Sequence, residues 1–153
     1  MIQNRIVLDT NVCLDLFVFH DPRWARLETA LRSGQLQAVT RADCRTEWRL
    51  VLAYANLALD NTAQANAGAA FDALIVCLPT PAPEAPACNI HLPRCSDPDD
   101  QKFLELARDA SAAILLTKDK ALLKLAGRCR RGGLFSIMKP ESWLDTLAPG
   151  AAA

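Results

Sequence analysis

The sequence predicts an α/β fold, a three-layer α/β/α sandwich around a central parallel sheet of about five strands. Strand-like and helix-like segments alternate from one end of the chain to the other. The strand-like segments are short, continuous apolar runs, as expected for strands that helices cover on both faces. The 153 residues suit one domain. Of these, 51% are hydrophobic, which is enough for a core that needs no disulfide or structural metal to stabilise it. We expect this domain over residues 1–148 and a frayed tail at 149–153.

The first expected strand is the β-branched run at residues 6–8, which stops at Asp9 as a buried strand with a polar end does. Apolar residues favour a short helix over 12–19. Asp21-Pro22 is a typical helix start, and apolar residues follow it at helical spacing up to residue 33, where Ser33-Gly34 ends the pattern.

The next segments repeat this alternation. Residues 35–39 form the second expected strand, and Thr40 is placed to cap a helix over 41–54. An alanine-rich stretch predicts a helix over 61–73, because alanine has the highest helix propensity. The apolar run at 74–78 is the third expected strand.

A proline-rich connection at 79–98 separates the two halves, and such long loops are often functional or disordered. The expected elements after it are a helix at 99–110, a strand at 113–117, a helix at 120–126, a glycine turn at 132–133, a strand at 134–138 and a helix at 140–147 that Pro140 opens.

Composition limits the function classes. Lys plus Arg and Asp plus Glu are both 17, so a strongly basic surface for nucleic acid is excluded, although an acidic pocket beside a basic rim is not.

No two of the six cysteines are spaced C-x-x-C and there are two histidines, which argues against a zinc site. A disulfide between Cys88 and Cys95 stays open. The N-terminus lacks a signal peptide and no apolar stretch reaches about 18 residues, so we expect no membrane span and a reducing cytoplasm.

Four acids stand where a ligand site is expected. The carboxyl ends of parallel strands line one edge of a sheet, and Asp9 and Asp119 each follow a predicted strand. Glu47 and Asp100 lie on the apolar faces of their helices, where an acid must pair or bind something. Converging carboxylates repel one another unless a cation such as Mg²⁺ or Mn²⁺ compensates. Such an ion can activate water and clamp a phosphodiester.

Each acid also has a local explanation. Asp9, Asp100 and Asp119 are all at positions where an aspartate caps a helix or favours its first turn, as Asp97 and Asp99 are. Glu47 has a structural alternative too, an ion pair with one of three arginines: Arg5, Arg41 or Arg45. No single acid therefore indicates a site. The indication is that all four acids occupy positions expected to converge at the carboxyl ends of the strands.

These stretches resemble a known family. Residues 7–12 (VLDTNV) look like the opening signature of PIN domains, residues 97–107 (DPDDQKFLELA) like their third acidic motif and residues 115–123 (LLTKDKALL) like their fourth. Glu47 fits the family's internal glutamate, and residues 137–144 look like its last strand and helix. The resemblance spans about residues 5 to 145. It is nearest to a subgroup classed as toxin components of bacterial toxin-antitoxin systems.

The resemblance implies a Mg²⁺- or Mn²⁺-dependent endoribonuclease, frequent dimers and a cognate antitoxin. It also implies site roles: catalytic and metal-binding acids at Asp9, Glu47, Asp100 and Asp119, with supporting hydrogen bonds from Thr10, Asn11 and Thr117. Four positions depart from the family. Cys13 and Asp15 are an unusual continuation of the first motif, Ala121 replaces a common further acid and weakens a second metal position, and Gln101 stands where Asn is common.

Three other functions compete. A phosphatase of the haloacid dehalogenase type needs a second acid two residues after the first, where this chain has Asn11. A receiver-like signalling domain has its lysine candidate in Lys139 but lacks the paired acids. A non-catalytic interaction module that keeps the fold is the third, and the presence of all four acids argues against it.

Basic residues gather around Asp119. They form either a solvated helix face or a rim that contacts the phosphate backbone of RNA, and their proximity to Asp119 favours the rim. The six are Lys118, Lys120, Lys124, Arg128, Arg130 and Arg131.

Overall fold

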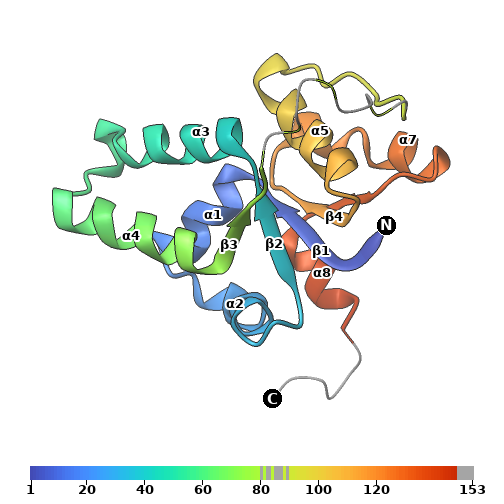
Figure 1. Ribbon diagram of the computed structural model, residues 1–153. Coiled ribbons are helices and arrows are strands. Elements are labelled where there is room, and N and C mark those ends of the chain that lie inside the picture. Colours follow the sequence, from blue (N-terminus) through green and yellow to red (C-terminus); the bar gives the residue numbers. More distant parts are fainter. Residues whose placement is uncertain (80, 82–83, 85–87, 89, 148–153) are drawn as a thin grey trace.

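A five-stranded parallel sheet forms the centre of the molecule (Figure 1). The structure is a computed structural model that describes residues 1–79, 81, 84, 88 and 90–147. The strand order of the sheet is β3-β2-β1-β4-β5, and every neighbouring pair is parallel. The predicted α/β/α architecture is confirmed. The expected frayed tail at 149–153 lies outside the described residues. The strands are β1 (Ile2–Leu8), β2 (Gln37–Thr40), β3 (Ile75–Cys77), β4 (Ala112–Leu116) and β5 (Ser136–Met138).

Helices connect the strands and cover both faces of the sheet. The α-helices are α1 (Thr10–Phe17), α2 (Ala25–Arg32), α3 (Ala42–Leu52), α4 (Asn61–Leu74), α5 (Gln101–Asp109), α6 (Lys120–Leu123), α7 (Ala126–Arg131) and α8 (Pro140–Asp145). Short 3₁₀ turns precede or follow some of them: η1 (Pro22–Trp24), η2 (Ala55–Leu57) and η3 (Pro98–Asp100). No helix among the residues described is long and apolar enough to cross a membrane.

Two cores lie on opposite faces of the sheet because successive residues of a strand point to opposite sides. Ile6 and Leu8 of β1 pack into the first core with α1, α2, α4 and α8, where Trp48 of α3 stacks on Phe71 at 5.1 Å between ring centroids. Val7, between them, packs into the second core with α5, α6 and α7. Figure 1 shows α5 and α7 on one side of the sheet and α4 and α2 on the other.

Several boundaries differ from the sequence-based prediction. β1 begins at Ile2, where Ile2 pairs with Ala112, although polar residues follow it. Thr40 does not cap α3: the helix begins after Arg41, whose carbonyl accepts the Thr40 hydroxyl at 3.4 Å. The single helix expected over 120–126 is two helices, and α7 was not predicted.

The order of the strands sets the place of a ligand site. The chain runs outward from β1 through β2 to β3, then returns to the other side of β1 to form β4 and β5. In open α/β sheets, ligands bind at the carboxyl ends of the strands where the winding direction reverses. That point lies between β1 and β4.

Candidate metal centre

Asp9 lies directly after β1 at this point of reversal and is 4% exposed. Its Oδ1 accepts a hydrogen bond from the backbone N–H of Thr10 at 2.7 Å. Its Oδ2 accepts the Thr117 hydroxyl at 2.6 Å and the Asn11 amide at 3.3 Å. Asp9 therefore is the N-cap of α1, as the local explanation proposed, and its carboxylate is also fixed in direction by the end of β4.

Thr117 joins the two strand ends. Its side chain is fully buried, its hydroxyl donates to Asp9, and the same oxygen accepts the backbone N–H of Asp119 at 2.9 Å. Asp119 in turn accepts the backbone N–H of Ala121 at 2.8 Å and caps α6. The expected meeting of Asp9 and Asp119 at one edge of the sheet is thus made through one threonine side chain.

Asp100 and Asp119 lie together with a third acid, Asp97. One carboxylate oxygen from each lies within 4.8 Å of the others. Two metal–oxygen bonds of about 2.1–2.4 Å span about 4–5 Å, so this separation suits oxygen ligands around one Mg²⁺ or similar ion. The Oδ2 atom of Asp100 is buried and has no hydrogen-bond partner among the described residues. A buried carboxylate oxygen without a donor needs a cation or a proton.

Asp97 was not singled out as a metal-site acid from the sequence. It caps η3 by accepting the backbone N–H of Asp99 at 3.0 Å, which is the role its position suggested. The sequence did contain an indication that Asp97 lies beside Asp100. The two residues are three positions apart, and side chains at that spacing eclipse one another along a 3₁₀ turn. The turn, rather than an α-helix, brings the two carboxylates to the same side.

Burial and mutual repulsion perturb two of these acids. Burial, contact with the Asp119 carboxyl and the charges of Asp9 and Asp97 raise the pKa of Asp100 from 3.8 to about 8. Burial also raises the pKa of Asp9 to about 6, against the hydrogen bonds from Thr117 and Thr10 that lower it. Both groups therefore favour a neutralising charge near pH 7, which a divalent cation supplies as well as a proton does.

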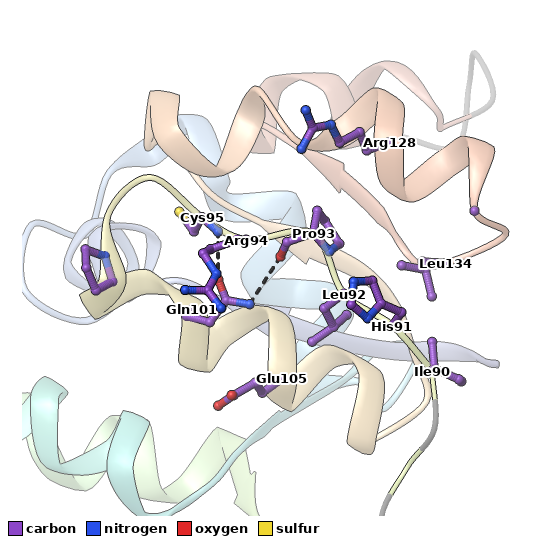
Figure 2. Close-up of a pocket in the computed structure, with 12 residues that line it drawn as sticks. Ile90, His91, Leu92, Pro93, Arg94, Cys95, Gln101, Glu105, Arg128 and Leu134 are labelled. Atoms are coloured by element: carbon purple, nitrogen blue, oxygen red, sulfur yellow. Dashed lines mark hydrogen bonds between the residues drawn. The ribbon is translucent and has the colours of Figure 1, made fainter.

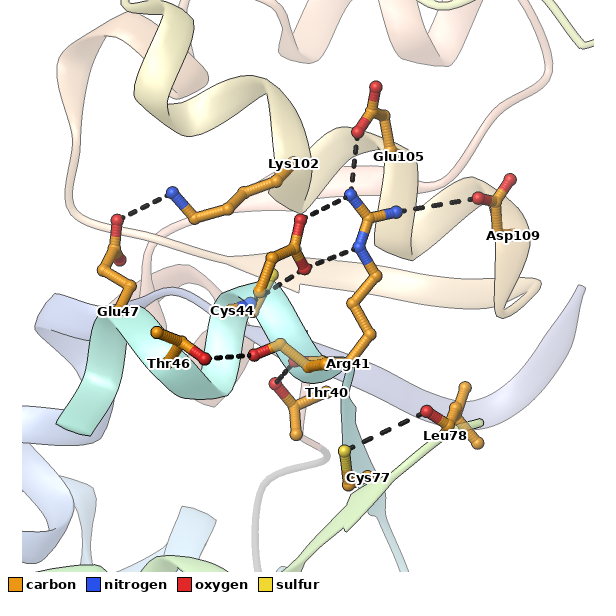
Figure 3. Close-up of polar contacts among 12 residues, drawn as sticks. Thr40, Arg41, Cys44, Thr46, Glu47, Cys77, Leu78, Lys102, Glu105 and Asp109 are labelled. Carbon is orange, nitrogen blue, oxygen red and sulfur yellow. Dashed lines mark hydrogen bonds and ion pairs between the residues drawn. The ribbon is translucent and has the colours of Figure 1, made fainter. Parts of the chain in front are cut away.

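Glu47 lies at the edge of this cluster and has its own partners. Its Oε1 accepts a hydrogen bond from the Lys102 ammonium at 2.8 Å (Figure 3), and its Oε2 accepts one from the Thr10 hydroxyl. The ion pair expected from the apolar-face position is real, but the partner is Lys102 of α5. Glu47 is not one of the three acids whose oxygens cluster, although its charge contributes to the raised pKa of Asp9.

Two of the three arginines proposed as partners of Glu47 have other contacts. Arg41 binds Asp43 at 2.7 Å and Glu105 at 2.8 Å, and Asp109 lies 3.7 Å away (Figure 3). Arg5 donates to Ala110 O at 2.9 Å. These contacts tie α3 and β1 to α5.

The basic cluster divides into two groups. Lys118 forms an ion pair at 2.7 Å with Asp15, a buried acid that also accepts the Trp24 indole N–H at 3.1 Å. This pair explains the unusual Asp15 after the first acidic motif, and it makes Lys118 a structural residue. The other five side chains of the cluster are exposed: Lys120, Lys124, Arg128, Arg130 and Arg131.

The cysteines take no part in the cluster. All six are free, so the disulfide considered between Cys88 and Cys95 is not formed. Burial and the nearby charge of Asp9 hold the pKa of the Cys13 thiol well above its usual value. The donor set at the strand ends is therefore made of oxygen atoms, the ligands that Mg²⁺ and Mn²⁺ prefer.

A comparison with protein families finds a match over most of the chain. A family model described as PIN domain matches residues 5–121, about three quarters of the chain. This span runs from β1 to α6 and contains all the acids described above. No curated protein matches the chain.

Proposed function

Because the chain belongs to the PIN domain family, whose members are generally metal-dependent nucleases, we propose that it is a Mg²⁺- or Mn²⁺-dependent endoribonuclease. One observation carries the proposal most directly. No residue in the described part of the chain donates a hydrogen bond to the buried Asp100 Oδ2, and the carboxylates of Asp97 and Asp119 lie beside it. A divalent cation satisfies this oxygen and neutralises the surrounding charge.

The residues fit such an ion. Asp100, Asp119 and Asp97 would hold it, and Asp9, fixed by Thr117, would complete the acidic set from the β1 side. When bound, the ion lowers the pKa of a water molecule and polarises the phosphodiester.

The remaining contacts of the proposed site orient the acids. Asn11 and Thr10 hold the Asp9 carboxylate in one direction, so its oxygens need no rearrangement to take a ligand. Glu47 connects α1 to α5 through Thr10 and Lys102, and we assign it a role in positioning the cluster while its charge adds to the field at Asp9.

We further propose that the protein is the toxin component of a type II toxin-antitoxin system, acting on RNA in the cytoplasm and held inactive by a cognate antitoxin. The support is the resemblance of its acidic motifs to that subgroup of the family. A homodimer is part of the same proposal. A reading frame for a small DNA-binding protein next to this one, whose product co-purifies with the chain, is the observation that tests it.

Cleavage of a single-stranded RNA by the purified protein tests the nuclease proposal. We expect cleavage with Mg²⁺ or Mn²⁺, none in excess chelator, and none by Asp100→Asn or Asp119→Asn. Asp145→Asn is the matched control, since Asp145 is an exposed acid on α8. RNA that is bound but left intact under all metal conditions would instead favour a non-catalytic interaction module.

A further inference from the structure

A large pocket lies beside the acidic cluster, on the side of α5 that faces α7 (Figure 2). Its volume is about 1030 Å³, and its lining comes from residues 90–95, Pro98, α5, α7 and the turn after α7. Ligand pockets typically have volumes of about 300–1,000 Å³, so this one has room for a nucleotide. None of the acids Asp9, Asp100 and Asp119 is part of its lining.

Side chains of α5 hold one wall of this pocket in place. The Gln101 amide accepts the backbone N–H of Cys95 at 2.7 Å and donates to the carbonyl of Pro93 at 3.2 Å (Figure 2). Arg108 donates to the carbonyl of Ile90 at 3.3 Å. Gln101 is one of the residues that depart from the family pattern, and an asparagine, one methylene shorter, would not make both contacts from the same backbone position. The segment that forms the wall is thereby fixed to α5.

The charges of the lining favour an anion. Arg94 and Arg128 lie on two sides of the pocket, and His91 adds a third basic group (Figure 2). Neither arginine forms an ion pair or a side-chain hydrogen bond with any residue in the described part of the chain. Glu105 is the acid of the lining, and its carboxylate is already paired with Arg41 at 2.8 Å.

Apolar groups complete the surface. Leu92, Pro93 and Leu134 line the pocket between the basic groups. A lining that joins free guanidinium groups to apolar side chains suits a ligand with both phosphates and flat, weakly polar rings. Arginine guanidinium planes also stack on unpaired bases.

The pocket and the acidic cluster share an element. Pro98 lines the pocket, while Asp97 before it and Asp100 after it belong to the acidic cluster, and Gln101 follows directly. The acids and the pocket are thus separated by no more than the single turn η3. An RNA strand with one phosphate at the acids would therefore have a neighbouring nucleotide close to the pocket. We propose that the pocket binds an unpaired nucleotide of a single-stranded RNA next to the phosphodiester at the acidic cluster; this inference rests on the nuclease proposed above.

Binding of a fluorescein-labelled single-stranded RNA decamer, measured by anisotropy in excess chelator, tests the inference without cleavage. We expect Arg94→Ala and Arg128→Ala each to weaken binding about fivefold or more. Each should also reduce the slope of log K against log salt by about 0.7, the value for one phosphate contact with a single strand. The control is Arg32→Ala, which removes the same charge from α2, away from the pocket (Figure 1). A fully paired RNA duplex of the same sequence should compete at least tenfold less well.

The outcomes separate this inference from the nuclease proposal. Equal affinity and salt slope for the pocket variants, the control and the wild type would overturn the pocket, even if metal-dependent cleavage is found. Binding that depends on Arg94 and Arg128, with no cleavage in any metal, would support the pocket and refute the nuclease. Gln101→Ala provides a second readout: it should weaken binding while the protein remains folded by thermal unfolding, because the wall at Pro93 and Cys95 is released.

Discussion

Replacing Asp100 with asparagine should stabilise the metal-free protein and remove its response to Mg²⁺. The Asp100 carboxyl has a pKa of about 8 in the folded protein and an ordinary value of 3.8. Between these two values the folded state holds a proton that the unfolded chain releases, so the free energy of unfolding of the wild type falls as the pH rises. Asparagine is neutral at every pH and carries no such cost.

The size of this effect follows from the shift. One pH unit between the two pKa values corresponds to 1.36 kcal/mol. At pH 7 about three units have been crossed, which gives about 4 kcal/mol as the upper limit of the gain for Asp100→Asn in chelator. For a chain of this length that upper limit corresponds to a rise in Tm of roughly 12 °C. The gain should be small at pH 5, grow up to pH 8 and stay constant above it.

Thermal unfolding of both proteins between pH 5 and pH 9, with chelator and with saturating Mg²⁺, measures the effect. Mg²⁺ at 100 times its Kd should stabilise the wild type by about 2.7 kcal/mol and the variant far less. Asp145→Asn controls for the loss of an exposed acid. An Asp100→Asn protein that is no more stable than the wild type in chelator at pH 8 would refute the reasoning, because Asp100 would then carry no repulsion for a cation to relieve.

Three further changes test the surrounding contacts. Thr117→Val removes a hydrogen bond that lowers the pKa of Asp9, so the midpoint of Mg²⁺ binding against pH should move up by about one unit, measured by calorimetric titration. Lys118→Met leaves buried Asp15 without its cation and should reduce the free energy of unfolding in urea by about 2 kcal/mol, less than for a fully buried pair because Lys118 is partly exposed. Glu47→Gln should reduce RNA cleavage about tenfold, while the loss of its ion pair with Lys102, whose side chains are 27% and 19% exposed, should lower the free energy of unfolding by only about 1 kcal/mol.

Each of these has a clear contrary outcome. An unchanged pH midpoint in Thr117→Val would mean that the threonine does not tune Asp9. A Lys118→Met protein that is fully stable but binds RNA poorly would return Lys118 to the proposed basic rim. A destabilised but fully active Glu47→Gln protein would remove Glu47 from the site.

The sheet and the strand-end acids were predictable from local sequence because strands and their ends are local features. The apolar runs located all five strands, and Asp9 and Asp119 lie where the carboxyl ends of parallel strands place them. β1 was predicted too short because its first half is held by pairing with a distant strand, Ile2 opposite Ala112, and not by its own hydrophobicity. α7 was missed because its glycine and arginine-rich sequence resembles a loop, and the burial of Cys129 against the second core gives it its place.

The partners of the acids could not be chosen from the sequence. Glu47 and Lys102 are 55 residues apart, and nothing in the local pattern favours Lys102 over the arginines nearer to Glu47. Capping η3 is a sufficient local explanation for Asp97, so the local pattern offered no reason to place its carboxylate beside that of Asp119. Ion pairs and clusters of this kind depend on the packing of α3, α5 and β4, which only the folded chain specifies.

The position of β1 in the sheet has a consequence for how the protein is made. β1 ends at Leu8 and its neighbour β4 begins at Ala112, so β1 is synthesised long before the strand that it pairs with. Until residue 119 has been synthesised, the nascent chain has Asp9, Asp97 and Asp100 but lacks Thr117 or Asp119. The acidic cluster therefore assembles only after Asp119 has been synthesised, and a nascent chain without β4 lacks a complete site for the nuclease activity proposed above.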